Sequence, residues 1–91
     1  MLDLVREAGL PTPEANVRIA GYEVDLLWRE PKLIVEIDGY AFHSMRSSFE
    51  RDRRRDQQLV AAGHRVIRVT WRQITDETIG VATRLATALA A

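Results

Sequence analysis

The sequence predicts an α/β fold in which a mixed four-stranded sheet is covered by helices. Two apolar runs, Val24–Trp28 and Leu33–Ile37, flank a turn that contains Pro31, a pattern typical of a β-hairpin. A helical stretch and a further apolar strand, Arg65–Thr70, follow the hairpin. A strand–helix–strand order of this length implies a right-handed crossover, which puts the last strand parallel to the second hairpin strand or nearly beside it.

The composition is that of one small globular domain, and we expect residues 1–91 to form it. A truncated start, inside the first helix, is also consistent with the sequence. With no cysteine, a disulfide framework and a zinc–thiolate site are excluded. No signal peptide or membrane-length apolar run is evident, so we expect a cytoplasmic protein without a membrane partner. Thirteen basic and 13 acidic residues give no net charge, so a nucleic-acid partner must be inferred from the charge distribution.

The first elements follow from glycines and apolar periodicity. Residues Leu2–Ala8 predict a short helix that ends at Gly9, because glycine favours the left-handed cap conformation. Asn16–Ala20 predicts a first strand that turns at Gly21 into the hairpin. The order so far is therefore a helix followed by three strands.

A long helix is predicted after the hairpin. Gly39 ends the third strand, and Tyr40–Met45 forms a loop. Ser47 and Glu50 have the spacing of a capping box, and Gly63 is a natural C-terminal stop. This helix supplies the crossover to the fourth strand.

The last helix is predicted to begin with Thr75 as its N-cap. Ile74 and Ile79 stand at the two positions of a hydrophobic staple. One apolar face continues along the helix through Ile79, Ala82, Leu85 and Leu89. The predicted order is αβββαβα.

The hairpin carries an unusual number of acids. If its connection has an even number of residues, acids of the two strands lie opposite one another on one face. The predicted pairs are Asp25 with Glu36, Leu27 with Ile34, and Glu23 with Asp38. Like charges directly opposite in an antiparallel pair are destabilising, and the apolar neighbours reduce hydration of the acids.

A divalent cation would remove both penalties, because Mg²⁺ prefers hard oxygen ligands. We therefore predict that Asp25, Glu36 and Asp38 bind Mg²⁺ or Mn²⁺. The alternative is a solvated outer face of a two-stranded ribbon, on which alternating acids are ordinary. A connection with an odd number of residues would place Asp25 and Glu36 on opposite faces and remove the argument.

Basic residues follow these acids. His43 lies in the loop after the third strand, where a neutral imidazole can act as a base or hold a water. An arginine run lies on or just before the long helix: Arg46, Arg51, Arg53, Arg54 and Arg55. Such a run is usually a solvated face, but beside a metal site it suits the backbone of a nucleic acid.

Asp52 and Asp56 lie in or beside the apolar stripe of the same helix, as does Arg53. One interpretation is a half-buried ion-pair cluster in which an arginine satisfies the aspartates, and we favour it for both aspartates. The other is a polar network that reaches the acidic face of the hairpin. For Arg53 both interpretations stay open.

Together these motifs resemble a known family. Asp25, the run Glu36–Gly39, His43, the ERDRRRD helix and the VIRVTWRQI strand look like the Vsr-like endonuclease domains. These domains belong to the PD-(D/E)XK nuclease superfamily and are widespread in bacteria. The resemblance covers roughly Val17 to Ile74.

The resemblance implies a restriction-endonuclease-like fold and metal-dependent cleavage of DNA. It implies Asp25 and Glu36 as metal ligands and His43 as a catalytic base or water-positioning residue. Asp38 stands where many relatives place lysine, so His43, Arg53 or a second cation would have to replace that charge. We therefore expect a DNA endonuclease domain, which cuts as a homodimer if both strands are cleaved. An inactive DNA- or partner-binding module and a purely structural domain are the alternatives.

Overall fold

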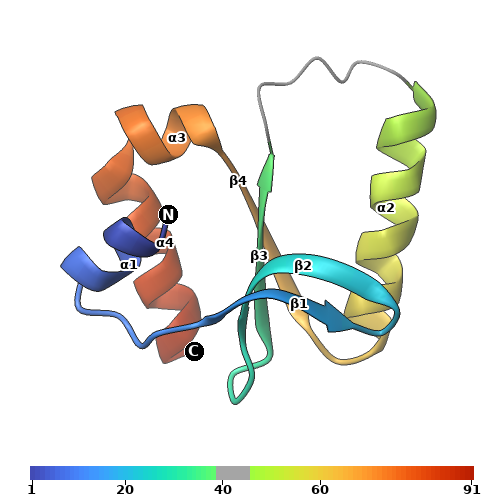
Figure 1. The fold of residues 1–91 in the computed structure, drawn as a ribbon, viewed down its shortest axis with the longest axis horizontal. Coiled ribbons are helices and arrows are strands. Elements are labelled where there is room, and N and C mark those ends of the chain that lie inside the picture. The colour runs from blue at the N-terminus through green and yellow to red at the C-terminus, as the bar shows by residue number, and fades with distance from the viewer. Residues whose placement is uncertain (39–45) are drawn as a thin grey trace.

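The computed structural model describes residues 1–38 and 46–91, without the side chains of residues 46–49 and 52. One sheet stands between two layers of helices (Figure 1). The elements in chain order are α1 (Leu2–Glu7), β1 (Glu14–Ile19), β2 (Tyr22–Trp28), β3 (Leu33–Asp38), α2 (Arg46–Ala61), β4 (Arg65–Thr70), α3 (Trp71–Asp76) and α4 (Thr78–Ala90). This order confirms the predicted α/β class, with the last helical segment divided into two.

The sheet is mixed, as predicted. Its strand order is β1-β2-β3-β4, in which the first three strands are antiparallel neighbours and β4 runs parallel to β3. Because β3 and β4 run in the same direction, their C-terminal ends lie at one edge, where Asp38 is opposite Thr70. Any side chains at these two strand ends are therefore neighbours in space.

Helix α2 covers one face of the sheet, while α1, α3 and α4 cover the other (Figure 1). The α2 side has a small core of buried residues: Val24, Leu27, Ile34 and Leu59. The opposite side has a larger core: Leu4, Val5, Leu26, Trp28, Leu33, Val35, Val69, Val81 and Leu85. Alternation along β3 therefore sends every second side chain toward α2.

The hairpin connection has the even length on which the acid argument depends. Leu27 pairs with Ile34, and the Lys32 N–H donates to the Arg29 carbonyl at 3.1 Å across the turn that contains Pro31. Lys32 has a φ of +53°, a left-handed conformation that closes the turn. The predicted pair of Leu27 with Ile34 is thus confirmed, but regular pairing ends at Leu26 and Val35 and does not include the predicted pairs of Asp25 with Glu36 and of Glu23 with Asp38.

The long helix begins at Arg46, one residue before the predicted cap at Ser47. At its end, Gly63 has a φ of +96°, and the His64 N–H donates to the Leu59 carbonyl at 3.1 Å. The predicted stop at Gly63 is confirmed. Within the described residues, no helix is long and apolar enough to cross a membrane.

The predicted start of the last helix was wrong. Thr75 lies inside α3, whose N-cap is Thr70. The Thr70 hydroxyl accepts from the Gln73 N–H at 3.0 Å, and Gln73 Oε1 accepts from the Thr70 N–H at 3.0 Å, so a T-x-x-Q capping box starts this helix. The predicted staple was also wrong, because Ile79 is 83% exposed. Val81 is buried in α4 instead, together with Leu85.

Candidate active site

The candidate site begins with Glu36, the buried acid near the C-terminal end of β3. Ile34 packs into the α2-side core, and Glu36, two residues on, points to the same side of the sheet. Only 3% of Glu36 is exposed, although carboxylates are rarely buried without partners. The strand pattern thus forces a charged group into a site where it needs compensation.

Two arginines supply that compensation to one oxygen of Glu36. Arg55 donates to Glu36 Oε2 at 2.9 Å from α2, and Arg68 donates to the same oxygen at 3.2 Å from β4. Glu36 Oε1 is buried and has no hydrogen-bond partner among the residues that the structure describes. Burial raises the pKa of Glu36, and the neighbouring charge of Arg55 opposes this rise.

Arg68 joins three carboxylates. Its position follows from the parallel register, which places Arg68 directly beside Glu36. Its guanidinium also donates to Asp56 Oδ2 at 2.7 Å, and its Nε lies 3.9 Å from Asp38 Oδ2. Burial lowers the pKa of Arg68, but the charges of Asp56 and Asp38 and the bond with Glu36 raise it above its ordinary value.

Asp56 therefore belongs to an ion-pair cluster that also reaches the acidic strand. The two interpretations of Asp56 from the sequence turn out to describe one network, because Arg68 connects Asp56 with Glu36. The side chain of Asp52 is not described. The network ties α2 to β3 and β4 at the edge where both strands end.

Asp25 reaches the same strand from β2. Regular pairing between β2 and β3 extends to Leu26 and Val35, one step short of the predicted pair of Asp25 with Glu36. Beyond that point Asp25 Oδ2 accepts a hydrogen bond from the Ile37 N–H at 2.7 Å. The half-buried carboxylate of Asp25 thus takes the place of a backbone acceptor beside the Glu36–Asp38 segment.

The predicted nucleic-acid contacts are not on one surface. Arg51 and Arg54 are exposed and line a hollow with Tyr22, whereas Arg53 lines a different hollow together with Arg68. Arg55 is bound to Glu36. Of the remaining predicted site residues, His43 lies outside the described residues, and Arg46 begins α2 with an undescribed side chain.

The chemistry of these acids fits a hard divalent cation. Asp25, Glu36 and Asp38 offer carboxylate oxygens, and Glu36 Oε1 is a buried acceptor with no hydrogen-bond partner among the described residues. Their present geometry is less complete: in the described part of the chain, no three acidic or histidine side chains are grouped as metal ligands. Arg68 contacts the acids that a cation would share.

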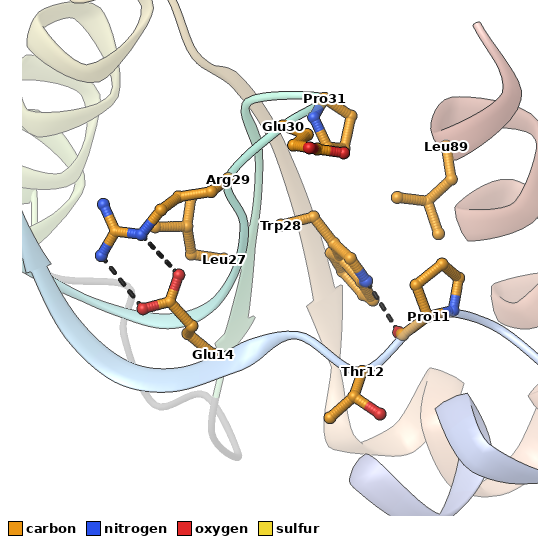
Figure 2. A pocket seen from close by; sticks show the side chains of 9 residues that line it. All are labelled: Pro11, Thr12, Glu14, Leu27, Trp28, Arg29, Glu30, Pro31 and Leu89. Carbon is orange, nitrogen blue, oxygen red and sulfur yellow. Dashed lines mark hydrogen bonds and ion pairs between the residues drawn. The ribbon is translucent and has the colours of Figure 1, made fainter.

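A separate hollow lies at the other end of the hairpin (Figure 2). The Trp28 indole N–H donates to the Pro11 carbonyl at 2.8 Å on its wall, and Leu89 of α4 faces the ring. Arg29 and Glu14 form an ion pair at its rim. Trp28 is 4% exposed and lies in the larger core, so it is a packing residue.

Sequence reasoning missed the role of Arg68, which was not among the predicted site residues. A signal was present: Arg68 interrupts the apolar strand Val66–Val69, and a charged residue inside such a strand requires a buried partner. The identity of that partner depended on the register between β3 and β4, which the sequence does not specify.

Comparisons with known proteins agree with this architecture. The restriction endonuclease family model REase_MTES_1575 matches residues 1–89. Among solved structures, the chain is similar to the catalytic domain of the homing endonuclease I-Bth0305I, with a TM-score of 0.78 and 18% sequence identity over 97% of this chain and 87% of that chain. At this identity the likeness establishes the fold. No curated protein sequence matches the chain.

Proposed function

Because the chain belongs to the REase_MTES_1575 family of nuclease-like domains, we propose that it is a metal-dependent endonuclease that hydrolyses DNA phosphodiester bonds. One observation carries the proposal: Glu36 is buried, two arginines bind one of its oxygens, and the other oxygen has no hydrogen-bond partner among the described residues. A carboxylate with one fixed and one open oxygen is suited to bind a cation.

Asp25, Glu36 and Asp38 would hold Mg²⁺ or Mn²⁺ at the ends of β3 and β4. When bound there, such a cation lowers the pKa of a coordinated water and polarises a phosphoryl oxygen. The protein's own part is to orient these ligands. Asp56 fixes Arg68 at 2.7 Å, and Arg68 with Arg55 fixes Glu36, so the carboxylate cannot turn away from the site.

His43 is the proposed acceptor of the proton released from the attacking water, at a ring nitrogen. Support for this role comes from the sequence, in which His43 follows the acidic strand by five residues. The order of motifs from Asp25 to Ile74 supports placing the domain in the Vsr-like branch of the superfamily. Double-strand cutting by so small a domain would use two copies.

Asp25→Asn tests the mechanism. Asparagine keeps a side-chain oxygen that can accept from the Ile37 N–H, so the variant retains the local structure while losing the charge. We expect Mg²⁺-dependent nicking of plasmid DNA to be abolished, with DNA affinity equal or higher because a negative charge is removed. Asp3→Asn, on the exposed surface of α1, is the matched control and should cut normally. Unchanged cleavage by Asp25→Asn would refute the mechanism.

A second candidate function is DNA binding without cleavage. The specific observation in its favour is that Arg55 and Arg68 already neutralise Glu36, and the described residues include no complete group of metal ligands. This candidate predicts salt-dependent DNA binding with no turnover in Mg²⁺ or Mn²⁺. Nicking that disappears on chelation and returns with Mg²⁺ would exclude it.

A further inference from the structure

The arginines of α2 divide between the two flanks of the helix. With 3.6 residues per turn, positions 51, 54 and 58 lie on one flank, whereas positions 53, 57 and 60 lie on the other. The contacts agree with this division. Gln58 Oε1 accepts from the Tyr22 hydroxyl of β2 at 2.9 Å, whereas Arg53 lines a hollow with Arg68 of β4.

A basic hollow lies on the β2 side of the helix. Tyr22, Arg51, Arg54 and Arg55 line it, and no acidic side chain is among these lining residues. Arg51 and Arg54 are exposed, and neither has a hydrogen bond or an ion pair with the described part of the chain. The Tyr22–Gln58 bond fixes the wall opposite the helix. Two guanidinium groups that no described acidic side chain neutralises are therefore held beside one concave surface.

Three other exposed arginines, by contrast, each form an ion pair with an acidic residue. Arg6 pairs with Asp3, Arg29 with Glu14, and Arg72 with Asp76. In a protein with equal numbers of acidic and basic residues, a pair of arginines with no acidic partner among the residues that the structure describes marks a local positive potential. The planar guanidinium group matches the oxygens of a phosphate.

We propose that the hollow of Tyr22, Arg51, Arg54 and Arg55 binds one phosphodiester group of the DNA strand. This inference rests on the proposed function and names the place where the strand is held. Arg51 and Arg54 contact the phosphate oxygens, while Tyr22 forms the opposite wall. Arg53, on the other flank, does not share this phosphate.

Arg55 connects the hollow to the candidate catalytic acids. It lines the hollow and also donates to Glu36 Oε2 at 2.9 Å. A phosphate bound by Arg51 and Arg54 is thus separated from Glu36 by a single side chain. The strand would cross α2 on its β2 flank and bring a nearby phosphodiester to the ends of β3 and β4.

The test is DNA binding without divalent metal. We compare the double variant Arg51→Gln/Arg54→Gln with a control of equal charge change, Arg6→Gln/Arg84→Gln, whose exposed arginines lie on helices that cover the other face of the sheet. Fluorescence anisotropy with a short labelled duplex in EDTA, at several salt concentrations, gives both the affinity and its salt dependence. All four positions are exposed, so both variants should keep the wild-type melting temperature.

The first double variant should weaken binding by about tenfold or more, and the slope of log K against log salt should fall by about one unit, as expected for one lost phosphate contact. The control should leave the slope unchanged. Equal losses of DNA affinity in the two double variants would refute phosphate binding in the hollow, without bearing on the proposed cleavage activity. The phosphate site would also be refuted if the wild-type protein did not bind DNA. The proposed cleavage function would then be tested separately, by plasmid nicking.

Discussion

Two glutamates of the sheet bind arginine in opposite ways. Near the hairpin turn, Glu14 binds Arg29 through both of its oxygens, at 2.6 and 3.0 Å, on an exposed surface (Figure 2). At the other end of the hairpin, Glu36 is buried, and both Arg55 and Arg68 bind the same oxygen. The first pair satisfies both carboxylate oxygens, whereas Glu36 Oε1 has no hydrogen-bond partner in the described part of the chain.

This difference separates a surface ion pair from a candidate site. The hydrogen bond with Glu14 and its charge raise the pKa of Arg29, but an exposed pair contributes little to folding because water and salt screen it. Burying Glu36 has a desolvation cost that one-sided hydrogen bonding does not fully offset. In our proposal the remaining oxygen of Glu36 offsets this cost when it binds a cation.

The largest effect is expected from Glu36→Gln. This change removes the charge that holds two partly buried guanidinium groups, so the free energy of unfolding should fall by about 3 kcal/mol. Urea unfolding measures the loss, and Glu14→Gln is the control with little expected change. If both glutamine variants were equally stable, the buried ion pairs of Glu36 would contribute no more to the free energy of unfolding than the exposed pair of Glu14.

An intermediate effect is expected from Arg68→Met. Methionine retains an apolar stem but leaves Asp56 and Glu36 without their shared cation, so the free energy of unfolding should fall by about 1–2 kcal/mol, reduced by partial exposure of the side chain. Arg68→Lys keeps the charge and should restore part of the loss in the same urea experiment. A methionine variant as stable as wild type would show that the ion-pair network of Arg68 does not contribute to the free energy of unfolding.

The smallest effect is expected from Arg29→Met. Loss of this exposed pair should leave the urea midpoint and plasmid nicking nearly unchanged, and any difference should vanish in high salt. Urea unfolding at low and high salt is the measurement. A large loss that persists in high salt would mean that the hairpin end is structurally as important as the acid cluster.

The sequence predicted the hairpin because its signals are local. Alternation with period two and Pro31 in the turn predict the two strands, and the register follows once the connection has an even length, as it does here; Gly63 supplies the positive φ that ends α2. The capping box of α3 is equally local, but the prediction placed the N-cap at Thr75 with Ile79 in a staple, whereas Thr70 is the N-cap and Ile79 is exposed. The predicted apolar face of the last helix was right for Leu85, which is buried, and for Ala82 and Leu89, which pack against the core, and wrong only for Ile79.

The candidate site was only partly predictable. Asp25 and Glu36 follow from hairpin spacing, and the structure brings Asp25 to the segment that contains Glu36. The contact of Glu36 with Arg68 depends on the parallel register across a crossover, which no local pattern specifies. The division of the α2 arginines depends on which flank faces β2, a tertiary property that a list of positive charges does not contain.

Calorimetric titration of Mn²⁺ tests the central claim most directly, because it requires neither a DNA substrate nor turnover. We predict one binding site in the wild-type protein, loss of that site in Glu36→Gln, and full retention in Glu14→Gln. Binding that is equal in wild type and Glu36→Gln, or no binding by the wild-type protein, would contradict the assignment of Glu36 as a cation ligand.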